Sequence, residues 1–146
     1  MTITKMTNIH VLQIAELEKL CFNDPWSEKS IASELNNRLS CWLVALDGEN
    51  VIGYVGSQTV IGETDMMNIA IHPDYRKQGV ATILIQSLIE ELTKHGSHSL
   101  MLEVRQTNEP AKNLYKSLGF ETVGIRKNYY RNPREDALIL RKEWSL

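Results

Sequence analysis

The chain has 146 residues, of which 42% are hydrophobic and 23% charged, and its formal net charge is −2. These values predict one globular domain over residues 1–146, and the near-neutral charge gives no reason to expect a nucleic-acid partner. The chain holds only Cys21 and Cys41, no apolar run of membrane-spanning length and no secretory signal over residues 1–9. We therefore expect a cytoplasmic protein without a disulfide framework.

Two helices open the predicted fold. The first is expected over residues 8–22, where apolar side chains recur close to helical spacing: Leu12, Ala15, Leu17, Leu20 and Cys21. The Asn23-Asp24-Pro25 segment is a turn signal that ends this helix. Ser27 is then expected to cap a second, short helix that runs through Leu35.

Strands and two further helices follow. The predicted strands are 41–46, 51–61, 63–71, 99–104, 120–128 and 137–141. A hairpin turn at Asp47-Gly48 and a hinge near Gly62 join the first three strands. One helix is expected over 79–94, and Asn108 is expected to cap another that runs to Leu118. This order predicts a mixed α/β fold with a mainly antiparallel sheet and flanking helices.

The turn before the long helix carries the clearest binding signal. Residues 76–81 read Arg-Lys-Gln-Gly-Val-Ala and follow a strand and a His72-Pro73-Asp74 break. A turn of this kind presents unpaired backbone N–H groups and the positive end of a helix dipole. Because both features attract anions, the turn favours a phosphate or pyrophosphate group.

A carboxylate stands in the middle of an otherwise apolar strand. Alternation places Leu102 and Val104 on one face of this strand, and Glu103 and Arg105 on the other. Burying an unpaired carboxylate is costly. Glu103 is therefore expected to lie on a solvated face, to pair with a nearby arginine or to serve a function.

The helix after that strand combines a cap with an aromatic stripe. Four residues share the stripe: Ala111, Leu114, Tyr115 and Leu118. Tyr115 is expected either at the edge of the core with its hydroxyl in water, or in a functional site. Asn108 caps the helix, and a capping residue can also touch a ligand.

In order and at these spacings, the motifs resemble the GNAT acetyltransferase superfamily. The acyl-CoA loop of that superfamily is Q/R-x-x-G-x-G/A, which Arg76, Gly79 and Ala81 satisfy. Four further segments make the likeness closer to bacterial RimI-type N-terminal acetyltransferases: Asn-Ile-Ala-Ile at 68–71, Leu-Glu-Val-Arg at 102–105, Leu-Tyr-x-x-x-Gly-Phe ending at Phe120, and Tyr129-Tyr130. The resemblance covers essentially the whole chain and implies acetyl-CoA as co-substrate.

The resemblance implies a role for each of these residues. Glu103 would be the general base that frees the acceptor amine, and Tyr115 the general acid for the departing coenzyme A thiolate. A backbone N–H of the strand would polarise the thioester carbonyl. Three sets of residues would contact acetyl-CoA: Ile69, Ala70 and Ile71 along the acetyl and pantetheine arm; Arg76, Lys77, Gln78, Gly79, Val80, Ala81 and Thr82 at the pyrophosphate; and Asn108 at the pantetheine arm.

The resemblance also implies an acceptor, the N-terminal alanine amine of a small-subunit ribosomal protein. Tyr129 and Tyr130 would hydrogen-bond its first residues, and Trp26 would wall the mouth of the site. The alternative is that the tyrosines only pack at a strand end and that Trp26 only plugs the core.

Two acidic residues near the last turn permit two interpretations. Glu135 and Asp136 would favour a basic acceptor tail. Alternatively, they pair with Arg131 or Arg134 and only hold the loop.

Other functions are less consistent with the motifs. A GNAT enzyme acting on a lysine ε-amine or a small amine would not need Tyr129-Tyr130, and a non-catalytic acyl-CoA-binding domain would need neither Glu103 nor Tyr115. We expect no metal site, because only His95 and His98 lie close together and no cysteine accompanies them. We expect a monomer with no membrane or nucleic-acid partner.

Overall fold

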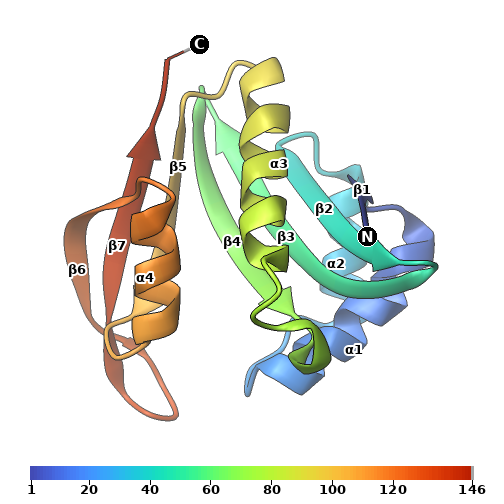
Figure 1. Ribbon diagram of the computed structural model, residues 1–146, viewed down its shortest axis with the longest axis horizontal. Helices are drawn as coiled ribbons and strands as arrows, with labels where there is room; N and C mark the ends of the chain where they lie inside the picture. Colours follow the sequence, from blue (N-terminus) through green and yellow to red (C-terminus); the bar gives the residue numbers. More distant parts are fainter. Residues whose placement is uncertain (146) are drawn as a thin grey trace.

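The computed structural model describes residues 1–145, which form one seven-stranded sheet of order β1-β2-β3-β4-β5-β7-β6 (Figure 1). The strands are β1 Thr2–Lys5, β2 Ser40–Asp47, β3 Asn50–Val60, β4 Glu63–Ile71, β5 Ser99–Arg105, β6 Glu121–Tyr130 and β7 Glu135–Glu143. All neighbouring strands are antiparallel except β4 and β5. The predicted mixed α/β fold with a mainly antiparallel sheet is confirmed.

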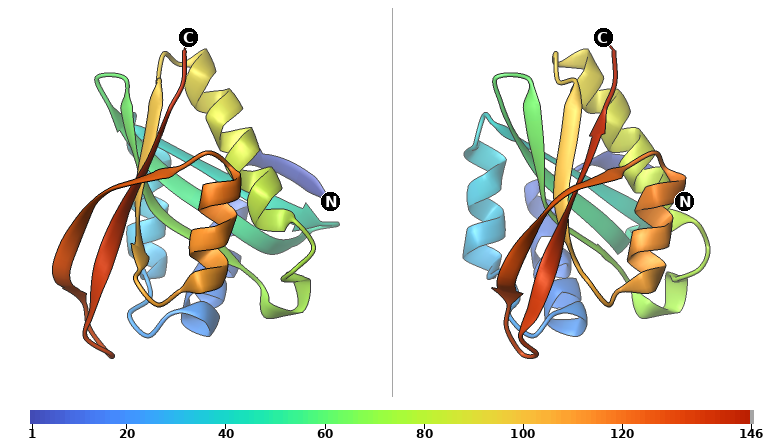
Figure 2. Two further views of the ribbon diagram at one scale, coloured as in Figure 1. Left: turned by 60° about the vertical axis from the view of Figure 1, so that its left-hand side comes forward. Right: turned by 90° about the vertical axis from the view of Figure 1, so that its left-hand side faces the viewer.

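Helices cover both faces of the sheet. The α-helices are α1 Val11–Cys21, α2 Glu28–Ser33, α3 Val80–Lys94 and α4 Glu109–Ser117, and the short 3-10 helices are η1 Asn8–His10, η2 Glu34–Asn36 and η3 Pro73–Tyr75. Figure 2 shows α3 and α4 on one face and α1 and α2 on the other. Within the described chain, none of these helices has the length and apolar character needed to cross a membrane.

Each face of the sheet has its own core. Alternation along β2 sends Leu43 and Ala45 toward α3, and Trp42 and Val44 toward α1. The α3 side is filled by a helical stripe that the apolar spacing predicts, namely Leu84, Ile85, Leu88 and Leu92, all of them buried. Because both cores rest on the same central strands, those strands are held rigidly between two layers of helices.

The N-terminal region differs from its prediction in two ways. Strand β1 was not predicted, because its four residues show no apolar alternation and it is held only by pairing with β2. In α1, Leu12 and Leu20 are 54% and 57% exposed. The buried face of that helix instead passes through Ile14, Ala15 and Glu18, so a carboxylate occupies a core position.

The feature that positions the site is the separation of β4 from β5. The two strands pair only through Glu63–Asp65 and Ser99–Met101, and beyond that point they diverge (Figure 1). Met67 has no partner in β3, so β4 bulges at the start of the divergence. The N-terminal ends of α3 and α4 lie at the same open end of the sheet (Figures 1 and 2).

Candidate active site

Strand β4 turns backbone groups that pair with no other strand toward the opening. The His72 N–H donates to the Ile52 carbonyl of β3 at 2.8 Å. Because backbone groups alternate along a strand, the N–H and C=O groups of Ile69 and Ile71 face away from β3. The side chains of Ile69 and Ile71 pack on the α3 face, and Ala70 is buried on the α1 face. Of the three residues expected along the acetyl arm, Ile69 and Ile71 therefore turn their backbone groups toward the opening, whereas Ala70 pairs with Tyr54 of β3.

The turn before α3 forms an exposed cradle of backbone amides. Lys77 and Gly79 both have left-handed backbone, with φ of 62° and 80°. The first hydrogen bond of α3 runs from the Ile83 N–H to the Gly79 carbonyl at 3.1 Å. The amides of Val80, Ala81 and Thr82 therefore precede the helical ladder and are free to bind an anion.

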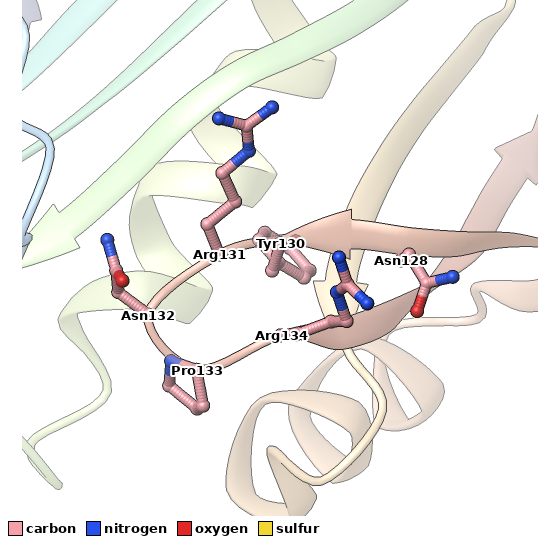
Figure 3. Close-up of a pocket in the computed structure, with 6 residues that line it drawn as sticks. All are labelled: Asn128, Tyr130, Arg131, Asn132, Pro133 and Arg134. Atoms are coloured by element: carbon pink, nitrogen blue, oxygen red, sulfur yellow. The ribbon is translucent and has the colours of Figure 1, made fainter.

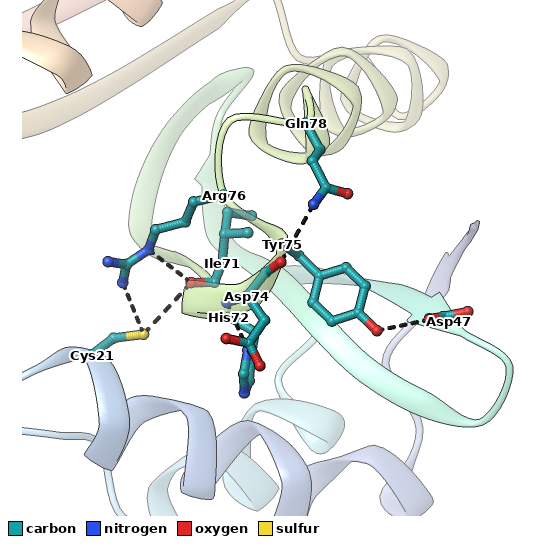
Figure 4. A network of polar contacts seen from close by, with 8 residues as sticks. All are labelled: Cys21, Asp47, Ile71, His72, Asp74, Tyr75, Arg76 and Gln78. Atoms are coloured by element: carbon teal, nitrogen blue, oxygen red, sulfur yellow. Dashed lines mark hydrogen bonds and ion pairs between the residues drawn. The ribbon is translucent and has the colours of Figure 1, made fainter.

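Arg76 does not point into that cradle (Figure 4). Its Nε donates to the Ile71 carbonyl at 3.3 Å, and its Nη2 lies 3.6 Å from Cys21 Sγ. Burial raises the pKa of the Cys21 thiol, so this cysteine stays protonated at neutral pH. Gln78 Nε2 donates to the Asp74 carbonyl at 3.3 Å, and this hydrogen bond stabilises the turn. Lys77, which makes no ion pair within residues 1–145, supplies the free positive charge.

Glu103 pairs with an arginine, which was one of the three expectations for this residue. Its side chain is 24% exposed, and its Oε1 lies 3.3 Å from Arg126 Nε on β6. It lies on the half-exposed face of β5, opposite Leu102 and Val104, which are buried in the core. Glu103 is thus held at the open part of the sheet, beyond the last residue of β5 that pairs with β4.

The ring of Tyr115 is buried, but its hydroxyl is not among the polar atoms that are sealed from solvent without a partner. The residue is 6% exposed, and its ring packs edge-on against Phe120 with centroids 5.6 Å apart. The hydroxyls of Tyr54 and Tyr75 bond to carboxylates, whereas the hydroxyl of Tyr115 makes no hydrogen bond to another described residue. Burial, with a smaller contribution from Tyr130, raises the pKa of Tyr115 to about 12, so the hydroxyl remains a proton-bearing donor.

Asn108 caps α4, as predicted. Its Oδ1 accepts from the Ala111 N–H at 3.2 Å. This bond fixes the first turn of the helix that carries Tyr115.

Arg105 organises the loop between β6 and β7. Its guanidinium lies 4.4 Å from the centre of the Tyr130 ring and donates to the carbonyls of Arg131 and Pro133, both at 2.9 Å. It also pairs with Glu135 at 3.3 Å. This cluster holds the loop against the end of β5.

The arginine partners expected for the two acidic residues, Arg131 and Arg134, are therefore wrong, and both residues make other contacts next to the loop. Glu135 pairs with Arg105 and also accepts from the Thr107 N–H at 2.6 Å, and these contacts, Thr107 first, lower its pKa. Asp136 accepts from the Asn128 N–H at 2.8 Å. Sequence proximity suggested Arg131 and Arg134, but strand pairing brings the end of β5 closer.

Tyr130 lines a hollow in the β6–β7 loop (Figure 3). Its volume is about 470 Å³, and its lining is Asn128, Tyr130, Arg131, Asn132, Pro133 and Arg134. Tyr129 is 51% exposed and meets Tyr130 edge-on at 5.1 Å. Burial, and next the negative charge of Glu103, raise the pKa of Tyr130 to about 12. Tyr130 therefore lines the hollow and lies near enough to Glu103 for that charge to act on its hydroxyl.

Trp26 is partly buried and packs against the core on the α1 side of the sheet. Its ring packs edge-on against Trp42 with centroids 5.3 Å apart. The loop that carries it nevertheless reaches the hollow, because Asn23 Nδ2 donates to the Asn132 carbonyl at 3.3 Å. The loop between α1 and α2 and the β6–β7 loop are therefore in direct contact.

Glu18 is a polar residue of this region that the sequence reading missed. It is 1% exposed and accepts hydrogen bonds from the Trp26 N–H, the Tyr54 hydroxyl and Asn68 Nδ2. Burial raises the pKa of Glu18 to about 7. Glu18 follows Ile14 by four residues, so both lie on the same face of α1. This spacing could have indicated from the sequence that Glu18 is buried.

The fold and this set of residues define an acyl-transfer protein, and comparisons with known proteins agree. The profile of the acetyltransferase (GNAT) family matches residues 11–120, and the chain belongs to that family. Residues 1–145 contain no cluster of three or more His, Cys, Asp or Glu side chains that could hold a metal ion.

Particular relatives are similar over nearly the whole chain. The ribosomal protein bS18-alanine N-acetyltransferase of Escherichia coli K12 is 38% identical over 141 residues, which cover 95% of both chains. The enzyme of the same name from Haemophilus ducreyi is 37% identical over 133 residues, covering 88% of this chain and 90% of that one.

Solved structures show the same likeness. The crystal structure of the E. coli ribosomal-protein-S18-alanine N-acetyltransferase superposes with a TM-score of 0.91 at 35% identity, covering 99% of this chain and 94% of that one. An aminoglycoside 6'-N-acetyltransferase complexed with coenzyme A shares the fold at 18% identity, with a TM-score of 0.84 and coverage of 98% and 97%.

Proposed function

We propose that the protein transfers the acetyl group of acetyl-CoA to the N-terminal alanine of a small-subunit ribosomal protein. The observation that carries this proposal is the opening between β4 and β5, which has an amide cradle at one end and Glu103 on the strand beside it. The names of the near full-length relatives support bS18 as the acceptor.

The opening fits acetyl-CoA by its chemistry. Left-handed backbone at Lys77 and Gly79 and the free amides that begin α3 suit a pyrophosphate, and Lys77 adds a positive charge. The inward N–H of Ile71 would donate to the thioester carbonyl and polarise it. Asn108 retains an amide NH₂ group that its capping bond does not use, and this group would contact the pantetheine arm.

Glu103 would serve as the general base. A peptide α-amine has a pKa of about 7.7–8.0, so most of it is protonated at neutral pH and cannot attack. Glu103 would accept the proton, directly or through a water, while the bond from Arg126 fixes the carboxylate. The freed amine attacks the carbonyl carbon, a C–N bond forms and the C–S bond breaks.

Tyr115 would assist the departing sulfur. Its hydroxyl, which makes no hydrogen bond to the described residues, is available to donate one to the thiolate. Because its pKa is about 12 and a thiol titrates near 8.5, it would act first as a hydrogen-bond donor and second as a proton donor.

The acceptor would enter from the side of the β6–β7 loop. Tyr130 is fixed by Arg105, and Tyr129 is half exposed beside it, so both hydroxyls would hydrogen-bond the first residues of a peptide. Glu135, which is committed to Arg105 and Thr107, would shape this side rather than bind a basic tail directly.

Two matched peptides test the proposal. One begins with alanine and is rich in arginine, and the other has the same sequence with a blocked α-amine and one lysine. We expect acetyl transfer from acetyl-CoA to the first peptide only. Transfer to the blocked peptide would favour a lysine acetyltransferase, and acetyl-CoA binding without transfer to either would favour a small-amine enzyme or a binding domain.

A further inference from the structure

Glu18 links three elements that surround the opening. Its Oε1 accepts from the Trp26 N–H at 2.8 Å, in the loop between α1 and α2. Its Oε2 accepts from the Tyr54 hydroxyl on β3 and from Asn68 Nδ2 on β4, the latter at 2.8 Å. Three groups therefore converge on a side chain that is 1% exposed, and each carboxyl oxygen of Glu18 accepts at least one hydrogen bond.

The link continues to the backbone of the opening. While Asn68 Nδ2 donates to Glu18, Asn68 Oδ1 accepts from the Ile69 N–H at 3.1 Å. Asn68 directly follows the bulge at Met67, where the register of β4 against β3 shifts. The orientation of one amide group therefore determines what the Ile69 N–H binds at the start of the opening.

We propose that Glu18 is a positioning residue for acetyl transfer, which fixes the Asn68 amide so that Asn68 Oδ1 holds the Ile69 N–H and the bulge of β4. This inference rests on the proposed function, because the bulged segment is where the acetyl group would bind. Glu18 itself is too buried to meet substrate, so it acts only through Asn68.

The Glu18 carboxylate also anchors a loop on the side where the acceptor peptide would enter. The bond to the Trp26 N–H anchors the loop between α1 and α2, and Asn23 of that loop bonds to Asn132 beside the hollow. One buried side chain therefore joins the strand that would hold the acetyl group to the loop that borders the acceptor.

A donor–acceptor swap tests the proposal. In Glu18→Gln, a Gln NH₂ group faces the Asn68 NH₂ group, which forces one of the two amides to turn. In the double variant Glu18→Gln, Asn68→Asp, the Gln NH₂ group meets a carboxylate, whose second oxygen still accepts from the Ile69 N–H. The control is Glu16→Gln, which makes the same chemical change at an exposed position of the same helix.

Two measurements separate positioning from general stability. The first is kcat and the acetyl-CoA KM with the alanine-starting peptide. We expect kcat to fall about tenfold in Glu18→Gln, with KM little changed, and to recover to within about threefold in the double variant. The second is amide hydrogen exchange of Ile69 in the free protein. We expect it to accelerate about tenfold in Glu18→Gln, to recover in the double variant and to stay unchanged in Glu16→Gln.

The outcomes are decisive even if one variant or the proposed function fails. Unchanged kcat and Ile69 exchange in Glu18→Gln, or a folded double variant with no recovery, would overturn the proposal. If Glu18→Gln does not fold, Asn68→Ala replaces it, and unchanged Ile69 exchange there would also overturn the proposal. If the wild-type protein does not acetylate the peptide, the proposed function fails, while the exchange measurements still test the link from Glu18 to Ile69.

Discussion

Arg105 at the end of β5 stacks on the ring of Tyr130 at the end of β6, with the guanidinium carbon 4.4 Å from the ring centre. The same guanidinium holds two carbonyls of the following loop and the Glu135 carboxylate. The last residue of β5 therefore determines the shape of the proposed acceptor side, while the proposed amide cradle for acetyl-CoA lies at the start of α3.

The first prediction follows from this separation. Arg105→Lys keeps the charge but loses the planar group that stacks and bonds in two directions. We expect KM for the acceptor peptide to rise about tenfold, equivalent to about 1.4 kcal/mol, while KM for acetyl-CoA stays within about twofold. The control is Arg38→Lys, which makes the same chemical change at an exposed position between η2 and β2. Equal increases in both KM values would contradict the separation of the acceptor side from the acetyl-CoA site.

Tyr115 provides a test that separates activity from stability. Its hydroxyl makes no hydrogen bond to the described residues and, unlike the indole nitrogens of Trp42 and Trp144, is not sealed from solvent, so Tyr115→Phe removes a polar group without breaking a bond within the protein. We expect the free energy of unfolding to stay within about 1 kcal/mol or to rise, while kcat falls about tenfold or more. Urea unfolding and steady-state kinetics on the same sample check both expectations. Full activity in this variant would remove Tyr115 from the mechanism.

The amide cradle can be tested with two matched glycines. Gly79 and Gly48 both have left-handed backbone, with φ of 80° and 62°, and a Cβ at either would meet no atom within 4 Å. Gly79→Ala and Gly48→Ala should therefore destabilise the protein similarly, by about 1 kcal/mol each.

Only the first of these variants should weaken acetyl-CoA binding. We expect the acetyl-CoA Kd, measured by calorimetry, to rise several-fold in Gly79→Ala and to stay unchanged in Gly48→Ala. If both variants bind acetyl-CoA as the wild type does, the turn before α3 is not its pyrophosphate site.

Glu18 makes a prediction about stability and pH. Burial raises its pKa in the folded protein to about 7 from an ordinary 4.5, so the folded state holds a proton that the unfolded state has released. Between those two pH values stability falls as pH rises, by about 3 kcal/mol for this group at 1.36 kcal/mol per pH unit.

The comparison with Glu18→Gln isolates this contribution. The wild type should lose stability relative to the variant between pH 4.5 and 7, and the difference should be constant above pH 8. Urea unfolding of both proteins across this range is the measurement. A difference that does not change with pH would mean that Glu18 is ionised in the folded protein throughout.

Local signals were sufficient for much of the fold. Ser27 accepts from the Ser30 N–H and Asn108 from the Ala111 N–H, so the two predicted caps are confirmed. The helix predicted over 79–94 is observed as Val80–Lys94, with Gly79 as the residue just before it. Each of these signals depends on residues within a few positions of one another, which a sequence displays directly.

The features that were missed depend on contacts between distant segments. Strand β1 exists because β2 offers a free edge, and Glu18 is buried because Tyr54 and Asn68 lie opposite it. The pairing of Glu135 with Arg105 spans 30 positions and follows from the alignment of β5 with β7. No local periodicity encodes such partners.

The most direct test of the account uses a peptide that has both a free alanine N-terminus and an internal lysine. After incubation with acetyl-CoA, tandem mass spectrometry locates the acetyl group, and the wild type is compared with Glu103→Gln. The account predicts acetylation of the α-amine alone by the wild type, and a rate at least about 100-fold lower in the variant with unchanged acetyl-CoA affinity. Acetyl on the lysine, or an undiminished rate in Glu103→Gln, would contradict it.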